Sequence, residues 1–581
     1  MHIIYLFILI NIFITTIRND PIFPLLYLNF PVGCEVRARL ESGWVCGLRR
    51  WAENNTVYAS FRGVPYAKQP LGELRFKELQ PAEPWDYLDA SEEGPICPQQ
   101  DVFYGKMMTS HKMEEACIYA NIHVPIEALP ESSLRRPLRH LKPPYEAGLS
   151  EEDDPQQPGL PILVFVHGGG FAFGSGNSDV YGPEYLVSKG VIVITFNYRL
   201  NVFGFLSLNT PSIPGNNALR DVITLLRWVR ANARSFGGDP EQVTLGGQSA
   251  GAAIAHLVSF APDTDGLFNR YLLILMSGTA MPAFYTLSPA FAQNIANMFL
   301  THLNITTTDP ELAHSQLIKL PLDKIMNANS MLIDFFGLTT FVPVLEKKLP
   351  GVNPVILEDP ITLMNKGVGR NMEMFIGFTS AECESFRPRF EQIDMVTRIN
   401  ENPLLVLSPN IIFNAPASDL LNIAKEVEQK YFNGEPTMDH YIHSCSDTFY
   451  NYPALKIAQM KQAMGGAPVF LYQFSYEGKA NVIKTAFGIN YKGVGHVEDM
   501  TYVFKVNSIM EKYITFPPGS KDDLMRKRMT AFVSNFVKCG PVDRYLRYQE
   551  IENTYYKSTD PTDAQIEMLE FFNSLYNTTT S

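Results

Sequence analysis

The sequence has little cysteine: seven of 581 residues, with no Cys-x-x-Cys pair and no His-Glu-x-x-His. Because those spacings are typical of redox dithiols and zinc sites, neither is indicated, and we expect no metal and no cofactor. Basic residues are also few, since 48 Lys and Arg stand against 60 Asp and Glu and give a formal net charge of −12. A nucleic-acid partner is not expected, because phosphate binding needs a basic stripe that this sequence lacks.

Long apolar runs are missing after the N-terminus. None reaches the roughly 18–20 residues that span a bilayer, so no stable membrane anchor is expected. The N-terminal run from Ile3 to Ile14 is typical of the apolar part of a secretory signal peptide, and it predicts a signal peptide over residues 1–18 and a secreted protein. No Lys or Arg precedes the run, and Thr15–Arg18 is a poor cleavage site, so an uncleaved segment or a misassigned start stays open. Three sequons are candidate glycosylation sites: Asn54, Asn304 and Asn577.

The sequence does contain enough apolar material for a large core, with 46% hydrophobic and 12% aromatic residues. Short extended apolar segments alternate with helical patterns such as Asn217–Val229. This alternation predicts an α/β fold with a large, mostly parallel central sheet and helices on both faces. The predicted strands are Leu160–Val166, Val191–Phe196, Val243–Gly246, Leu272–Met276, Met374–Gly377 and Val469–Phe474.

One segment, residues 131–158, lacks apolar periodicity. It contains several prolines, the pair Arg135-Arg136 and the acidic run Glu151–Asp154. Such a composition cannot bury enough apolar surface to fold alone. We therefore expect a mobile surface insertion without a function of its own.

The most informative motif is Gly-Gln-Ser-Ala-Gly at positions 247–251. A β-rich run precedes it, and a good helix-forming run, Ala252–Val258, follows it. A strand that turns sharply into a helix at Gly-x-Ser-x-Gly exposes the serine Oγ, and the glycines permit close backbone approach. The turn also places the backbone N–H of Ala250 at a helix N-terminus, where an oxyanion would form. Ser249 is therefore a candidate nucleophile.

A second glycine-rich motif follows the predicted strand Leu160–Val166. His167 is followed by three consecutive glycines, whose N–H groups no side chain obstructs. The N–H groups of Gly169 and Gly170 are therefore candidates for an oxyanion hole built from the main chain. This motif lies about 80 residues before the serine motif, in the order that α/β-hydrolases use.

Together these motifs resemble the type-B carboxylesterase family of the α/β-hydrolase fold, which includes cholinesterases and insect esterases. The resemblance implies one carboxylesterase domain over residues 34–560, and a hydrolase that cleaves small-molecule carboxylic esters through an acyl-enzyme. It leaves the oligomeric state open. Further segments resemble the family: Phe61–Ala67, Leu71–Phe76, Asn197–Leu200, Gly215-Asn216 and Phe236–Pro240.

The resemblance implies a Ser-His-Glu triad. The family's Gly-x-x-His loop matches residues 493–496, which makes His496 the expected base. The family's acid lies five residues beyond the glycine at a strand end, and counting from Gly377 gives Glu382. Cys383 stands where the family has glycine, which leaves Glu384 as a second candidate for the acid. The expected site therefore consists of Ser249, Glu382 and His496, with Gly169, Gly170 and Ala250 as the oxyanion hole.

The same resemblance implies a disulfide between Cys97 and Cys117, which match the family's first Cys loop. It also implies an ion pair between Arg75 and Glu115. A pair of Cys34 and Cys46 is conceivable. The remaining cysteines are expected as free thiols: Cys383, Cys445 and Cys539.

The loop between Cys97 and Cys117 contains no Trp, the residue with which cholinesterases meet a quaternary ammonium, so a choline site is not expected. Gln248 and the segment Glu115–Pro125 look most like insect carboxylesterases, including antennal and detoxifying forms, which suggests degradation of xenobiotic, odorant or pheromone esters. A juvenile hormone esterase is an alternative, although Val222 replaces the glutamine usual after Asp221 in those enzymes. A non-catalytic, cholinesterase-like adhesion protein is a second alternative.

Overall fold

The computed structural model describes residues 34–101, 111–134, 159–269, 272–281, 288–336, 339–479, 481–508, 514–540, 548–551, 556–559 and 561–579. The predicted signal peptide lies outside these residues, and so does the predicted insertion from residue 135 onward. Residues Glu35–Ser581 form one unit by their internal contacts. Within the described part of the chain, no helix is both long and apolar enough to cross a membrane.

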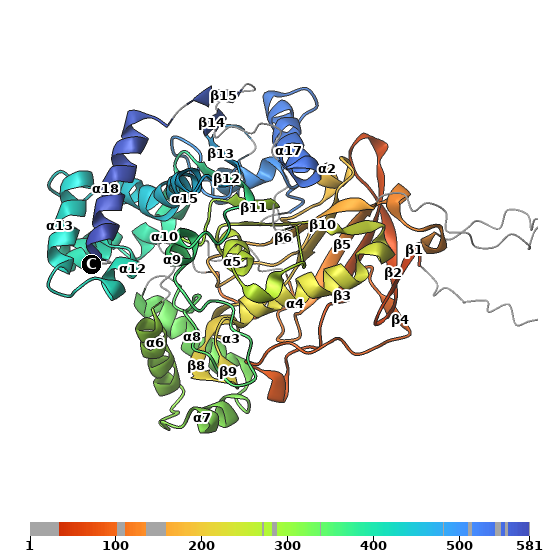
Figure 1. Ribbon diagram of the computed structural model, residues 1–581, viewed down its shortest axis with the longest axis horizontal. Helices are drawn as coiled ribbons and strands as arrows, with labels where there is room; N and C mark the ends of the chain where they lie inside the picture. The colour runs from red at the N-terminus through yellow and green to blue at the C-terminus, as the bar shows by residue number, and fades with distance from the viewer. Residues whose placement is uncertain are drawn as a thin grey trace, which may run out of the picture. The chain divides into compact units, whose positions relative to one another are not determined.

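Thirteen strands of the described residues form one sheet in the order β1-β2-β3-β5-β7-β6-β10-β11-β12-β13-β14-β15, with β4 beside β2 (Figure 1). The seven strands from β7 to β14 run parallel, and antiparallel strands extend the sheet at both ends. A separate ribbon pairs β8 with β9. The strands are β1 (Val36–Leu40), β2 (Gly43–Trp51), β3 (Val57–Pro65), β4 (Tyr87–Asp89), β5 (Tyr119–Pro125), β6 (Leu160–Val166), β7 (Ile192–Phe196), β8 (Ser207–Thr210), β9 (Ile213–Pro214), β10 (Gly238–Gln248), β11 (Leu272–Met276), β12 (Glu373–Thr379), β13 (Val469–Phe474), β14 (Tyr548–Ile551) and β15 (Tyr556–Thr559).

Side chains of the central strands alternate between two apolar cores. In β6, Val164 belongs to one core, whereas its neighbours Leu163 and Phe165 belong to the other. Strands buried on both faces are therefore apolar throughout, which explains the continuous apolar runs of the sequence. Helices α4, α5 and α15 contribute to the first core, and α2 and α17 to the second. Their bounds are α2 (Glu184–Val187), α4 (Asn217–Asn232), α5 (Ala250–Ser259), α15 (Tyr452–Ala463) and α17 (Lys521–Cys539). This arrangement confirms the predicted fold class.

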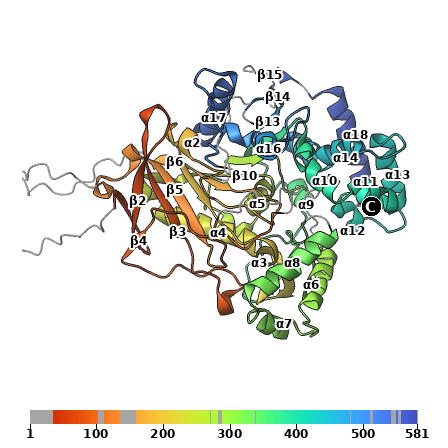
Figure 2. The ribbon, with the colours of Figure 1, turned by 180° about the vertical axis from the view of Figure 1, so that it is seen from behind.

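The remaining helices come largely from the chain between β11 and β13. Several of them start with a Ser or Asp cap followed by proline, which fixes the first turn, as at Ser288-Pro289 and Asp359-Pro360. Figures 1 and 2 both group α6, α7 and α8 in one place and α12, α13 and α18 in another. The bounds are α3 (Asn201–Phe205), α6 (Pro289–His302), α7 (Pro310–Leu317), α8 (Leu322–Phe336), α9 (Pro360–Asn365), α10 (Arg387–Gln392), α11 (Met395–Glu401), α12 (Pro409–Asn414), α13 (Leu420–Tyr431), α14 (Met438–Ser446), α16 (Val482–Phe487) and α18 (Asp563–Thr579).

Candidate active site

Ser249 occupies a strained turn between β10 and α5. Its backbone has φ 57° and ψ −129°, which non-glycine residues rarely adopt and which recurs at functional sites. Glycine is required on both sides: a Cβ on Gly247 would lie 2.5 Å from the carbonyl carbon of Gly251, and one on Gly251 would lie 2.2 Å from the carbonyl oxygen of Val166. The Ser249 N–H donates to the carbonyl of Met276 on the neighbouring strand at 2.8 Å, which ties the turn to the sheet.

The other predicted site residues follow the ends of neighbouring parallel strands. The glycine loop follows β6, Glu382 follows β12, and His496 follows β13. Because the carboxyl ends of parallel strands share one edge of a sheet, these segments meet the Ser249 turn there. Glycines 168–170, Ser249 and His496 all line one cavity.

His496 and Glu382 form a buried pair. Nδ1 of His496 lies 2.6 Å from Oε2 of Glu382, and the two residues are 2% and 0% exposed. Their main chains are also joined, since the His496 N–H donates to the Glu382 carbonyl at 3.0 Å. The second carboxylate oxygen accepts hydrogen bonds from the Ser277 hydroxyl and the Thr379 N–H, both at 2.7 Å. A carboxylate held at both oxygens fixes the orientation of the imidazole.

Glu384, the second candidate for the acid, points to a different partner. Its carboxylate forms a two-pronged ion pair with Arg387, at 2.8 and 2.9 Å. The structure therefore brings Glu382, and not Glu384, to the imidazole.

The other ring nitrogen of His496 contacts Gln248. Nε2 of Gln248 lies 3.1 Å from Nε2 of His496, and Gln248 is 2% exposed. Because Nδ1 faces a carboxylate, the proton of a neutral imidazole belongs on Nδ1, and Nε2 carries the lone pair that accepts from the Gln248 amide. The interpretation of the sequence used Gln248 only as a likeness to insect esterases and gave it no contact with His496; its place before Ser249 was the only signal available.

The glycine loop has a backbone that only glycine tolerates. Gly169 has φ 114°, and a Cβ there would lie 1.9 Å from the carbonyl oxygen of Phe173. Gly170 has φ 58°. Ala250 begins α5, so its N–H belongs to the unpaired first turn of a helix. These are the donors that the sequence proposed for an oxyanion hole.

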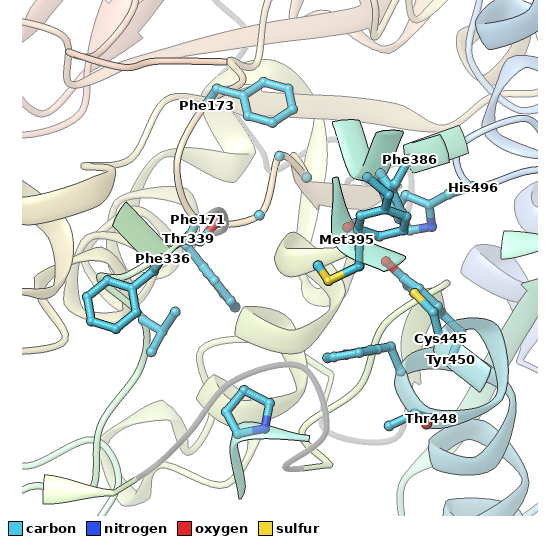
Figure 3. Close-up of a pocket in the computed structure, with 18 of the residues that line it drawn as sticks. Phe171, Phe173, Phe336, Thr339, Phe386, Met395, Cys445, Thr448, Tyr450 and His496 are labelled. Carbon is cyan, nitrogen blue, oxygen red and sulfur yellow. The ribbon is translucent and has the colours of Figure 1, made fainter. Parts of the chain in front are cut away.

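The cavity has a volume of about 410 Å³ and a mostly apolar wall. Figure 3 shows Phe171 and Phe336 on one side of it and Met395, Phe386 and Tyr450 on the other. The rings of Phe386 and Tyr450 also pack against the His496 imidazole, with centroids 5.2 and 4.7 Å away. Tyr450 lies in a π-helical segment, Asp447–Asn451, that joins α14 to α15. Sequence patterns did not predict this wall.

One prediction about the cysteines was wrong. Cys383 and Cys445, expected as free thiols, form a disulfide across 62 positions of sequence. Cys445 belongs to α14 and lines the cavity (Figure 3). Cys383 directly follows Glu382 in the sequence. The prediction failed because α14 packs on the turn that contains Glu382, a contact that no local pattern encodes.

The other cysteines fall into two groups. Cys97 and Cys117 form a disulfide, and Cys34 and Cys46 are disulfide-bonded as well. Cys539 is free and exposed. Beside Cys117, Glu115 accepts both Nε and Nη2 hydrogen bonds of Arg75, at 2.7 and 2.5 Å.

The sequons occupy two kinds of position. Asn54 and Asn304 are exposed, with φ 53° and 57°, and Asn577 belongs to α18. The first two side chains are therefore accessible to a modifying enzyme.

Comparisons with known proteins agree on one family. Residues 35–572 match the Carboxylesterase family. Juvenile hormone esterase of Heliothis virescens is 50% identical over 554 residues, which cover 93% of this chain and 94% of that protein. Juvenile hormone esterase of Tribolium castaneum is 28% identical over 527 residues, covering 86% and 83%. The crystal structure of juvenile hormone esterase from Manduca sexta, with OTFP covalently attached, has a TM-score of 0.86 at 50% identity and covers 94% of this chain and all of that one. The protein belongs to the carboxylesterase family and is a carboxylic ester hydrolase.

Proposed function

We propose that the protein hydrolyses a long, apolar carboxylic ester, with juvenile hormone as the substrate, through an acyl-enzyme on Ser249. The observation that carries the proposal is the 2.6 Å contact of His496 with Glu382, next to a serine that shares an apolar cavity of about 410 Å³. The pairing of a base with an orienting acid beside a nucleophile is the arrangement that acyl transfer needs.

In the first half of the reaction, Ser249 Oγ attacks the ester carbonyl carbon while His496 Nε2 takes its proton. This requires that the Gln248 amide leave the Nε2 lone pair. Glu382 stabilises the imidazolium that forms, and the N–H groups of Gly169, Gly170 and Ala250 stabilise the oxyanion. The tetrahedral intermediate then expels the alcohol, which takes the proton from His496.

In the second half, a water molecule enters in place of the alcohol. His496 Nε2 accepts a proton from this water as its oxygen attacks the acyl carbon. The second tetrahedral intermediate collapses with release of the carboxylic acid, and Ser249 Oγ recovers its proton from His496. Water is the second substrate of the reaction, and the same base activates both nucleophiles.

The choice of substrate rests on two supports. The first is the apolar wall, because a long apolar chain gains about 0.8 kcal/mol for each CH₂ that it buries. The second is the pair of juvenile hormone esterases that are 50% identical to this chain. These relatives favour the juvenile hormone alternative over general detoxification or odorant degradation. They outweigh Val222, whose place after Asp221 pointed away from those enzymes.

A substrate panel tests this assignment. Four additional buried CH₂ groups correspond to about 3 kcal/mol, so kcat/KM for juvenile hormone should exceed that for naphthyl acetate by about 100-fold or more. A series of naphthyl esters with two to ten acyl carbons is the matched control, since only chain length varies. Equal kcat/KM values for naphthyl acetate and juvenile hormone would contradict the juvenile hormone assignment and indicate a general esterase.

We also propose that the chain enters the secretory pathway. The apolar run before residue 18 and the oxidised state of six of its seven cysteines support this, because disulfides persist in oxidising compartments. N-terminal sequencing and glycosidase treatment of the protein made in insect cells test it, with cleavage near residue 18 and modified Asn54 and Asn304 as the expected results.

No observation favours the adhesion alternative.

A further inference from the structure

The residue after His496 has a backbone conformation that is costly for its type. Val497 has φ 79°, and a β-branched residue at positive φ is a genuine outlier. Such strain persists only where the surroundings hold it. Relaxation of Val497 would rotate the backbone of His496 and move the imidazole, so the groups that restrain this loop control the position of the base.

A chain of hydrogen-bonding groups surrounds the loop. One oxygen of Glu498 accepts the Gly495 N–H at 2.9 Å, and the other lies 2.7 Å from the Tyr491 hydroxyl. The Tyr491 hydroxyl lies 3.2 Å from Ser385 Oγ, and Ser385 Oγ lies 3.0 Å from the carbonyl oxygen of His496. Glycine at 495 makes this possible, because a Cβ there would lie 2.2 Å from the tyrosine hydroxyl and 2.3 Å from the serine Oγ.

The charge of Glu498 decides how many of these contacts can be hydrogen bonds. Three oxygen-to-oxygen contacts link Glu498 through Tyr491 and Ser385 to the His496 carbonyl. The two hydroxyls supply only two protons, and each contact needs one. The carbonyl cannot donate, so Ser385 donates to it. With Glu498 ionised, Tyr491 donates to the carboxylate, and the 3.2 Å contact between Tyr491 and Ser385 has no hydrogen. With Glu498 protonated, the acid donates to the Tyr491 oxygen, Tyr491 donates to Ser385, and all three contacts are hydrogen bonds.

We infer that Glu498 is a positioning residue, and that the protonated form of Glu498 holds the His496 loop in place through Tyr491 and Ser385. Ionised Glu498 would instead accept a hydrogen bond from the Tyr491 hydroxyl. The contact of Tyr491 with Ser385 would then have no hydrogen. The inference rests on the proposed function only in that His496 acts as the base.

The surroundings of Glu498 favour the neutral acid. Glu498 is 1% exposed, and burial raises its pKa to about 7 against the opposing hydrogen bonds and the charge of Lys484. Lys484 itself sits over the Tyr491 ring at 4.4 Å and donates to the Gly493 carbonyl at 2.7 Å. The titratable or charged groups around Glu498 are Lys484 from α16, Tyr491, His496 and Asp499 from its own loop, and Tyr502, which donates to Asp522 at 3.0 Å.

The sign of the pH dependence follows from this arrangement. Below pH 7 Glu498 is protonated and the chain to the His496 carbonyl is complete. As the pH rises through about 7, the acid ionises and one contact is lost. We expect kcat to fall about fivefold between pH 6.5 and 9, the usual equivalent of one hydrogen bond, while KM changes little.

The test is the pH profile of Glu498→Gln. The amide of glutamine can donate to Tyr491 and accept from Gly495, as the protonated acid does, but it cannot ionise. The variant should retain wild-type kcat at pH 6.5 and lose the fall toward pH 9. Tyr491→Phe interrupts the chain at every pH, so its kcat at pH 6.5 should already be as low as that of the wild type at pH 9, without an alkaline fall.

The matched control is Asp522→Asn, which makes the same change at another buried carboxylate that accepts from a tyrosine. It should keep the alkaline fall. Each rate is divided by the concentration of active sites, which is counted by stoichiometric labelling with an organophosphate. A loss of folded protein therefore does not change the shape of a pH profile. If Glu498→Gln keeps the alkaline fall, or Tyr491→Phe keeps wild-type kcat, the inference is overturned.

Failure of the proposed function looks different from failure of this inference. If His496 is not the base, His496→Ala will turn over esters at the wild-type rate. If only the inference fails, the wild type is active, His496→Ala is inactive, and the profiles of wild type and Glu498→Gln coincide.

Discussion

Nε2 of Gln248 lies 3.1 Å from Nε2 of His496, so the residue before the candidate nucleophile contacts the ring nitrogen that the proposed reaction uses as its base. The amide and the Ser249 hydroxyl compete for the same acceptor. In the proposed mechanism, an ester carbonyl bound among Gly169, Gly170 and Ala250 would draw Ser249 Oγ toward the carbonyl carbon and favour the serine in that competition.

Gln248→Glu should move the acidic limb of the kcat/KM profile. A buried carboxylate 3 Å from Nε2 stabilises the imidazolium, so the neutral base exists only at higher pH. We expect the midpoint of this acidic limb to move to higher pH by about one unit or more. Gln248→Leu, which removes the amide without adding charge, is the control and should not raise it. An unchanged limb in Gln248→Glu would show that position 248 does not face the base in solution.

Glu382→Gln and Glu384→Gln distinguish the two candidates for the acid. Glutamine at 382 removes the charge that stabilises the imidazolium, and comparable triads lose about 10⁴ in turnover. Glutamine at 384 weakens only the partly exposed pair with Arg387, which costs at most about 1 kcal/mol of stability. Steady-state kcat of both variants is the measurement. An inactive Glu384→Gln together with an active Glu382→Gln would place the acid two residues later.

Gly169→Ala should distort the glycine loop but leave the contact between His496 and Glu382 intact. The added Cβ would meet the Phe173 carbonyl oxygen at 1.9 Å and force the loop to shift. Loss of one oxyanion donor costs about 10²–10³ in turnover. Turnover of naphthyl acetate measures it, and the distance between Nδ1 of His496 and Glu382 in a crystal of the variant is the control. Wild-type turnover would remove this loop from the reaction.

The disulfide between Cys383 and Cys445 should affect both stability and turnover. It closes a loop of about 62 residues, which corresponds to about 4 kcal/mol of chain entropy. It also fixes the residue after Glu382 to the cavity wall, together with a 3.0 Å hydrogen bond from the Cys383 N–H to Ser446 Oγ. We expect the variant with serine at 383 and 445 to unfold at lower denaturant concentration and to lose kcat.

The variant with serine at 97 and 117 is the matched control for that disulfide. It opens a loop of about 20 residues outside the triad and should lose about 3 kcal/mol with little change in kcat. Equal losses of kcat in the two double variants would contradict a specific link between Cys383 and the acid.

The sequence predicted the central strands well because their signal is local. Leu160–Val166, Leu272–Met276 and Val469–Phe474 match β6, β11 and β13 residue for residue, and strands buried on both faces have continuous apolar runs. The predicted segment Val243–Gly246 covers only part of β10, because Gly238–Gln242 lacks an apolar run and only Gly238 of it has a partner in β6.

The parts of the site that the sequence did not predict depend on contacts between distant segments. The disulfide of Cys383 forms where α14 packs on the turn after β12. The cavity wall combines side chains that are far apart in the sequence, such as Phe171, Phe336 and Met395. The contact of Gln248 with His496 spans 248 positions. Ser249, Gly169 and Gly170 could be named from glycine motifs that directly follow strands, whereas Glu382 and His496 were named through the resemblance to the carboxylesterase family.

The most direct test of the central claim is covalent labelling of the nucleophile by an organophosphate, followed by peptide mass spectrometry of the intact enzyme and of Ser249→Ala. The account predicts one adduct per molecule, on Ser249, with loss of juvenile hormone and naphthyl acetate turnover in proportion to labelling. It also predicts no adduct and no turnover in Ser249→Ala. Labelling at another residue, or wild-type turnover by Ser249→Ala, would contradict it.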